Sequence, residues 1–298
     1  GIQDSQLITI DGKVMAVAFM ANTQHLYVRT DVLKENGIAI PKTYEEVVAA
    51  SEKIRAAGKM KYPYAAAYKA GWNLAEEFVN MYIGHGGEFF KAGSAKPNIN
   101  NAKGVATLNM LKKLADLSNP DYLTHDSEAI KVEWEAGNVA IMTLWASRSG
   151  TLLDDDGDAK ITAATKLVAP ATVGGGNIPA ATLWWDGFTL AKNRSDADAE
   201  ASFRAMAHAA SSKEMVAKAA DQAVWLVEGF VPGPKSVGVI EAVKMGAKPY
   251  PMLPQMGLMH GALGSEIVEF LQGNESAEQA LKDVEAAYMT KAKEQGFL

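Results

Sequence analysis

Apolar residues recur along the chain with two spacings. A repeat of three to four residues places apolar side chains on one face of a helix. It predicts helices at residues 44–58, 71–87, 102–117, 127–137, 196–212, 259–273 and 276–296. Short apolar runs predict strands at residues 61–68, 138–145, 161–170 and 185–193. Helices and strands alternate irregularly, which favours a mixed α/β fold.

Polar residues mark the start of several expected helices. Thr43 is followed three residues later by Glu46, the spacing of a capping box. Asn101 and Ser195 stand in the same place before two later helices. We therefore expect these side chains to accept hydrogen bonds from the first turn of each helix.

Residues 11–31 contain a turn, an apolar run, a polar interruption at residues 21–24 and a second strand-like run. Two structures fit this pattern. One is a poorly formed edge strand. The other is a strand that crosses between two lobes and presents its polar middle to a ligand.

Composition narrows the function classes. The chain has 298 residues, of which 48% are hydrophobic, enough for one large or two medium domains. Its net charge of −6 comes from interspersed acids and bases, so neither nucleic acid nor a charged membrane surface is an expected partner. The lack of cysteine excludes thiol catalysis, disulfides and thiolate metal sites. The chain begins with Gly1 and lacks a signal-like start, so we expect a processed or cut product.

Two glycine-containing segments suggest a calcium loop and a phosphate-binding loop, but neither has the residue spacing that such a loop requires. If Gly157 takes the sixth position of a calcium loop, the first position is Leu152 and the twelfth is Ala163, so two required acids are missing. The three glycines at residues 174–176 belong to no phosphate-binding pattern. We expect a solvated turn at the first and a flexible loop at the second.

Other catalytic patterns are missing too. The five histidines show no metal-ligand spacing, and no nucleophile elbow occurs. The pairs Glu45–Glu46 and Glu76–Glu77 lie on expected helices, where one member of a pair normally faces water. We therefore expect no enzyme activity, no metal and no cofactor.

The tryptophans are the most unusual feature that remains. Trp72, Trp145 and the pair Trp184–Trp185 lie at the ends of expected elements. An indole ring is a flat apolar face with one N–H donor, which suits a sugar ring, although tryptophans also fill cores. Because neighbours in a strand point to opposite faces, one of the adjacent pair is expected to be exposed or in a cleft.

The order of segments resembles the family 1 extracellular solute-binding proteins of ABC importers, which include maltose-binding protein. No single motif is diagnostic, but five segments follow the family's order over nearly the whole chain. They are residues 11–54, 84–87, 134–145, 186–206 and 271–288. The resemblance implies a two-lobe α/β fold of the periplasmic-binding-protein type, with a ligand cleft and hinge between the lobes.

The resemblance also implies which residues face the cleft. In the family, the stretch at residues 11–31 is a strand that crosses the hinge. Carried over by position, the ligand-binding residues are Asn22, Trp72, Trp145, Arg148, Trp185, Asp186 and His260. Gln24 is a weaker candidate.

The chain departs from the family at its start, where a strand-helix-strand series of the first lobe is missing. The alignment assigns residues 1–19 and 186–237 to a remnant of lobe 1, and residues 20–185 and 238–298 to lobe 2. Such a remnant would expose apolar surface. We therefore expect a companion chain to carry the missing segment and cover residues 186–237.

The resemblance implies a carrier that delivers a carbohydrate-like solute to the membrane subunits of an ABC permease. It implies a periplasmic or extracellular location, with membrane or lipid association in a Gram-positive cell. Arg148 stands where relatives have an aromatic residue, so an anionic sugar remains an alternative. Further alternatives are a charged non-sugar solute, and a carbohydrate-active enzyme or lectin with a tryptophan-lined cleft.

Overall fold

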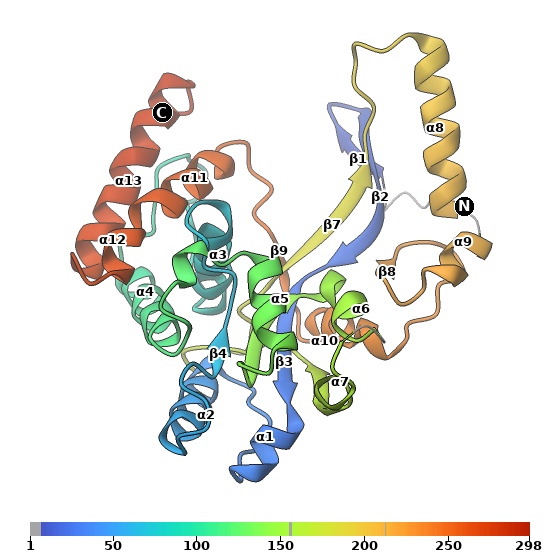
Figure 1. Cartoon of the computed structure of the whole chain (residues 1–298). Helices are drawn as coiled ribbons and strands as arrows, with labels where there is room; N and C mark the ends of the chain where they lie inside the picture. The colour runs from blue at the N-terminus through green and yellow to red at the C-terminus, as the bar shows by residue number, and fades with distance from the viewer. Residues whose placement is uncertain (1–6, 155–156, 212) are drawn as a thin grey trace.

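The computed structural model describes residues 7–154, 157–211 and 213–298, and its strands form two sheets (Figure 1). The first sheet contains β1 (Leu7–Ile10), β2 (Lys13–Asn22), β7 (Thr182–Phe188), β8 (Val224–Trp225) and β9 (Lys248–Pro249). The second sheet has the order β4 (Tyr64–Ala65), β5 (Ile141–Trp145), β3 (Gln24–Arg29) and β6 (Thr165–Val168). The expected mixed α/β fold is confirmed.

The stretch at residues 11–31 passes from one sheet to the other. Strand β2 ends at Asn22 in the first sheet, and β3 begins at Gln24 in the second. The expectation of a crossing strand is therefore correct, and that of an edge strand is wrong. Only part of the polar middle reaches solvent, however: Asn22 is half-buried, whereas Thr23 and Gln24 are buried. The Thr23 hydroxyl donates to the carbonyl oxygen of Thr182, 2.8 Å away, and so joins the crossing strand to β7.

Helices cover both faces of the second sheet. The larger core lies between this sheet and α2 (Tyr44–Ala56), α3 (Trp72–Gly84), α4 (Ala102–Ala115), α11 (Met256–Glu266), α12 (Val268–Leu271) and α13 (Ala277–Glu294). A smaller core includes Tyr27, Met142 and Trp134, which belongs to α5 (Ser127–Glu135). These cores hold α3 and β5 in fixed positions.

The first sheet carries less packing. Figure 1 shows α8 (Asp196–Ser211) on the same side of the molecule as the hairpin of β1 and β2, and apart from α3, α4, α11 and α13. Phe203 on α8 is 45% exposed, and Met15 on β2 is 53% exposed. The apolar surface in this part of the chain is therefore largely uncovered. The domain boundaries at residues 19, 185 and 237 stay a prediction.

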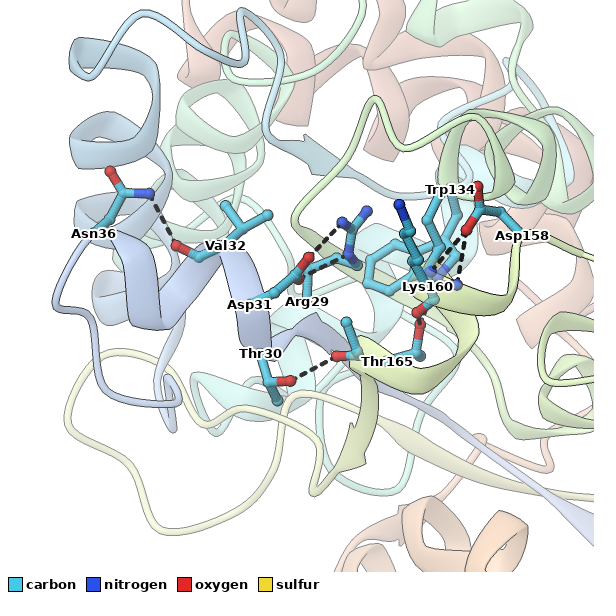
Figure 2. Close-up of polar contacts among 11 residues, drawn as sticks. Arg29, Thr30, Asp31, Val32, Asn36, Trp134, Asp158, Lys160 and Thr165 are labelled. Carbon is cyan, nitrogen blue, oxygen red and sulfur yellow. Dashed lines mark hydrogen bonds and ion pairs between the residues drawn. The ribbon is translucent and has the colours of Figure 1, made fainter.

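One expected strand is partly a helix. Residues 159–164, within or next to the strand predicted at 161–170, form α7 (Ala159–Ala164), and only β6 is extended. The cause is a cap: the Asp158 carboxylate accepts from the backbone N–H groups of Lys160 and Ile161, 2.8 and 3.2 Å away (Figure 2). Residues 155 and 156 of the acidic turn lie outside the described residues.

Figure 2 also shows how β3 leads into α1 (Thr30–Glu35). The Arg29 guanidinium forms two bonds with the Asp31 carboxylate, 3.0 and 2.7 Å long. The Thr30 hydroxyl donates to the carbonyl oxygen of Ala164 at 2.8 Å, and Trp134 Nε1 donates to the Thr165 hydroxyl at 3.2 Å. These bonds fix the far end of the crossing strand against α7 and α5.

The expected caps are present. Thr43 accepts from the backbone N–H of Glu46, Asn101 from those of Lys103 and Gly104, and Ser195 from that of Asp198. The structure also contains the short helices α6 (Ser149–Leu152), α9 (Lys213–Lys218), α10 (Val237–Lys244), η2 (Tyr122–Thr124), η3 (Ala146–Arg148) and η4 (Pro234–Ser236). In the part of the chain that the structure describes, no helix has the length and apolar character required to span a bilayer.

Candidate ligand-binding site

Five aromatic side chains from separate elements meet in what we call the aromatic cluster. They are Trp72 at the start of α3, Trp145 at the end of β5, Trp184 in β7, Tyr250 after β9 and His260 in α11. The ring of Trp72 lies 6.3 Å from that of Trp145 and 5.8 Å from that of Trp184, between centroids. Trp72 is 51% exposed. The cluster therefore presents an indole face to solvent.

The cluster lies where the chain crosses between the sheets. In the strand registers, Trp184 pairs with Asn22 at the end of β2, and Trp145 pairs with Gln24 at the start of β3. The two tryptophans thus flank Thr23, the residue between the two strands. A solute bound on the cluster would lie beside both crossing strands.

His260 packs against Trp72 and forms a hydrogen bond with its backbone. Its Nε2 lies 3.0 Å from the Trp72 carbonyl oxygen, which can only accept, so Nε2 carries the proton. Nδ1 can then accept from the Tyr250 hydroxyl, 2.9 Å away. Burial lowers the pKa of His260, which keeps the ring neutral. His260 is only 4% exposed, so the structure places it behind the tryptophan.

Two glycines let α11 approach the start of α3. Gly71 has a φ of +98°, a conformation open to glycine, and its N–H donates to the Gly264 carbonyl oxygen at 2.9 Å. A Cβ at Gly264 would lie 2.3 Å from the Gly71 carbonyl oxygen. This close contact fixes the position of Trp72, the next residue in the chain.

Trp184, not Trp185, belongs to the aromatic cluster. The Trp184 ring lies 4.4 Å from that of Tyr250, and its Nε1 is hydrogen-bonded to buried side chains. Side chains alternate along a strand, so Trp185 faces the other way. It lies over Gly187, where a Cβ would come within 2.9 Å of the Trp185 ring. The role expected of Trp185 stays a prediction.

The other expected residues lie around the cluster and are mostly engaged. The Asn22 side-chain oxygen accepts from the backbone N–H groups of Thr23 and Ser147, at 3.0 and 3.2 Å, and its Nδ2 donates to the Ser147 hydroxyl. Arg148 forms an ion pair with Glu128. Asp186 is exposed in β7, and partial desolvation raises its pKa. Ligand contacts for Asn22, Arg148 and Asp186 remain predictions.

The adjacent acids of α3 are both buried. Glu76 is 0% exposed and Glu77 is 4% exposed, so the expectation that one of them faces water is wrong. Desolvation raises the pKa of each carboxyl to about 8. The expectation failed because α3 is covered on nearly all sides: all of its residues from Leu74 to Gly84 are buried.

Sequence reasoning found Trp72 and Trp145 but missed three residues of this region. Tyr250 follows a strand of only two residues, and nothing near it in the sequence marks it. The sequence shows that Trp184 and Trp185 point to opposite faces of a strand. It does not show which of these faces is covered by a helix, and so which ring joins the cluster. Glu76 did carry a signal, because it follows Trp72 by four residues and so shares its helix face.

A separate cavity lies at the edge strand β4. It has a volume of about 280 Å³ and its lining includes Tyr64, Tyr122 and Glu133. The Glu133 carboxylate accepts from the side-chain amides of Asn119 and Asn138, at 3.2 and 2.9 Å. This acid of the cavity wall is therefore already hydrogen-bonded within the protein. No residue of the aromatic cluster lines this cavity. Over the described ranges, no group of three or more His, Asp or Glu residues is placed to hold a metal ion.

Comparison with known proteins agrees with this architecture. The sequence pattern of the bacterial extracellular solute-binding proteins matches residues 3–216. The chain belongs to this solute-binding protein family. A relative in Deinococcus radiodurans, described as a probable ABC transporter-binding protein, is 32% identical over 193 residues. That match covers 62% of this chain and 44% of the relative, so the chain spans less than half the length of the curated relative.

Solved structures share the fold of this solute-binding protein. Maltose-bound T. maritima MalE3 matches with a TM-score of 0.83 and 20% identity, over 97% of this chain and 76% of that one. A ribitol complex from Agrobacterium radiobacter K84 matches with a TM-score of 0.79 and 20% identity, over 96% and 73%. A D-mannitol complex from Agrobacterium vitis S4 matches with a TM-score of 0.79 and 17% identity, over 99% and 78%. The two-lobe α/β fold of periplasmic-binding proteins is thereby confirmed.

Proposed function

We propose that this protein is the substrate-binding component of an ABC importer and captures a carbohydrate-like solute, either a sugar, an oligosaccharide or a polyol. The observation that carries the proposal is the aromatic cluster, with the half-exposed Trp72 beside the crossing strands. Indole faces bury the C–H surface of a sugar ring at a small cost in side-chain ordering. The sugar and polyol complexes among the structural neighbours support the same class of solute.

The charges around the cluster favour a neutral solute over an anionic one. Arg148, the cation expected nearby, is paired with Glu128, so an anion would have to displace a carboxylate. On the other side, Asp186 is exposed and would repel an anion. The buried carboxyls of Glu76 and Glu77 add no positive potential. A neutral polyol requires none of these groups to change partners.

The protein acts as a carrier and not as an enzyme in this proposal. A solute on the aromatic cluster contacts the proposed second lobe through Trp72, Trp145 and Trp184. It reaches the proposed first lobe through the exposed Asp186, two residues after Trp184 in β7. Contacts to both lobes stabilise the closed state more than the open one and so shift the population toward closure. The closed protein then presents its solute to the membrane subunits of a permease, from a periplasmic or extracellular position.

The exposed indole gives a direct test of solute binding. Trp72→Ala is expected to weaken binding by about 10- to 100-fold, or about 1.4–2.8 kcal/mol, because it removes the exposed ring face. Trp72→Phe should retain most of the affinity. Calorimetry with maltose, ribitol and mannitol measures both, after the wild-type protein has identified the solute that binds.

A surface substitution away from the cluster serves as the control. Val132 is 63% exposed on α5, and Val132→Ala should leave the dissociation constant unchanged. Equal affinity of Trp72→Ala and the wild-type protein would rule out the cluster as the binding surface. If none of the three solutes binds the wild-type protein, the proposed solute class fails.

We also infer that a companion chain covers residues 186–237. Leu190, Phe203 and Val231 are 40%, 45% and 78% exposed. Contact between these apolar side chains and water is unfavourable, and a partner that covers them would remove it. This part would belong, with residues 1–19, to the first lobe, while residues 20–185 and 238–298 form the second.

Mass measurement under native and denaturing conditions tests the companion chain. The expected result is a second, smaller polypeptide that is released on denaturation. A single polypeptide that stays monomeric, with Phe203 and Val231 ordered and in contact with solvent, would contradict the inference. Spin labels placed at residues 203 and 231 measure whether these two positions are ordered and in contact with solvent.

A further inference from the structure

Helix α3, which begins at Trp72, has a row of residues on one face that leads from Trp72 into the core. Trp72, Glu76, Asn80 and Gly84 follow one another at intervals of four and therefore share one face of α3. This face packs against the segment that leads into β7. At Gly84 the approach is so close that a Cβ would lie 2.6 Å from the Cβ of Ala180. The row thus runs from an exposed indole to a tight contact between helix and strand.

Glu76 and Thr182 together hold the indole N–H of Trp184. Trp184 Nε1 lies 3.1 Å from Glu76 Oε1 and 2.8 Å from the Thr182 hydroxyl. The hydroxyl is in turn 2.8 Å from Glu76 Oε1 and 2.7 Å from Asn80 Oδ1. The edge of the Trp184 ring is therefore fixed by two oxygens from different elements.

A protonated Glu76 satisfies all these contacts. Thr182 has a single hydroxyl proton, which it can donate to Asn80, because the side-chain oxygen of Asn80 can only accept. Glu76 can then donate its own proton to the Thr182 oxygen, which also accepts from Trp184. Asn80 Oδ1 further accepts from the backbone N–H of Thr182 at 2.8 Å. The contacts of Glu76 Oε1, Thr182, Asn80 and Trp184 are thus all satisfied when the carboxyl is neutral.

The same network holds the crossing strands. Asn80 Nδ2 donates to Gln24 Oε1 in β3, 3.2 Å away, and Thr23 donates to the Thr182 carbonyl oxygen. The position of Trp184 is thus tied to both strands that pass between the sheets. Packing alone does not require a carboxyl here, because burial of an acid costs free energy and Glu76 Oε2 is buried with no hydrogen-bond partner.

We propose that Glu76 is a positioning residue for the solute site: it fixes the plane of the Trp184 indole within the aromatic cluster. The Trp184 ring plane stands at 60° to Trp72 and 83° to Trp145, and these angles define the shape of the indole surface. Without Glu76, one of the two oxygens that hold the indole N–H is lost and the ring can turn. The inference rests on the proposed function, which assigns solute binding to this cluster.

Near-ultraviolet circular dichroism of the solute-free protein tests the positioning directly, because coupling between indoles depends on their relative orientation. Glu76→Leu should reduce this signal and weaken solute binding about 10-fold, or about 1.4 kcal/mol. Glu76→Gln keeps an oxygen acceptor and should restore most of both. Glu77→Gln is the matched control, because Glu77 is the next buried acid on α3 and its side chain bonds Gln24, whereas the Trp184 N–H bonds Glu76. It should change neither readout.

A double-mutant cycle separates positioning from a general effect on folding. Trp184→Phe removes the N–H that Glu76 holds, so Glu76→Leu should have no further effect on affinity in that background. If Glu76→Leu does not fold, the same cycle is run with Glu76→Met, which keeps the length of the side chain but has no oxygen to hold the indole N–H. Wild-type dichroism and affinity in Glu76→Leu, or additive losses in the cycle, would overturn the proposal. If the wild-type protein binds no solute, the proposed function fails, whereas the dichroism still decides whether Glu76 orients Trp184.

Discussion

Raising the pH from 7 to 9 is expected to lower the free energy of unfolding by about 2–3 kcal/mol. The cause is the pair of buried acids on α3, because burial raises the pKa of Glu76 and of Glu77 to about 8. In the unfolded chain both groups titrate near 4.5. Above that value the native protein holds protons that the unfolded chain has released, so stability falls as the pH rises through 8.

The chosen pH window isolates these two groups. Burial lowers the pKa of His25 to about 4 and lowers the pKa of His85 and His260, so these rings destabilise the native state only below their ordinary pKa of 6.5. Buried tyrosines such as Tyr64 have a raised pKa and stay protonated in the native state. Between pH 7 and 9 the two glutamates therefore dominate the change.

Urea denaturation at several pH values measures the slope. The double variant Glu76→Gln/Glu77→Gln should flatten the dependence between pH 7 and 9, because an amide does not titrate. Each single variant should remove about half of it, or about 1.4 kcal/mol. A wild-type profile that is flat over this window would mean that the carboxyls are ionised or solvated in the native protein.

Much of the fold could be predicted from local chemistry. The helix starts at Thr43, Asn101 and Ser195 are set by side chains that bond to the first turn, and such bonds involve neighbours in sequence. The segment at 161–164 was predicted wrongly because its Ala and Ile residues suit either state. The cap at Asp158 decides in favour of the helix.

The candidate site was less predictable, because its shape depends on contacts between distant segments. Trp184 and Trp185 are equivalent in sequence, and only the position of α3 on one face of β7 selects Trp184. Thr23 and Gln24 look like ligand-binding groups in a strand, yet they are buried and bond to Thr182 and Asn80. Polar residues at a crossing point can therefore serve the hinge strands themselves.

Replacement of Gly264 by alanine is expected to destabilise the protein by about 3 kcal/mol and to weaken solute binding. The added Cβ would lie 2.3 Å from the carbonyl oxygen of Gly71 and 2.8 Å from its Cα. Both are backbone atoms, so no side chain can turn aside to make room. Gly71 also takes a conformation that suits glycine alone, with a φ of +98°, and it has little freedom to adjust. The start of α3 must move, and Trp72 moves with it.

Gly261 provides a matched control on the same helix. A Cβ there meets nothing within 4 Å, and the residue is exposed, so Gly261→Ala should stabilise α11 by up to about 1 kcal/mol through helix propensity. Urea denaturation and calorimetry with the bound solute compare the two variants. Loss of both stability and affinity in Gly264→Ala alone would show that the contact between α11 and Gly71 sets the position of the exposed indole. If Gly264→Ala is as stable as Gly261→Ala, the helices can separate at little cost, and the position of Trp72 must come from His260 and its hydrogen bond.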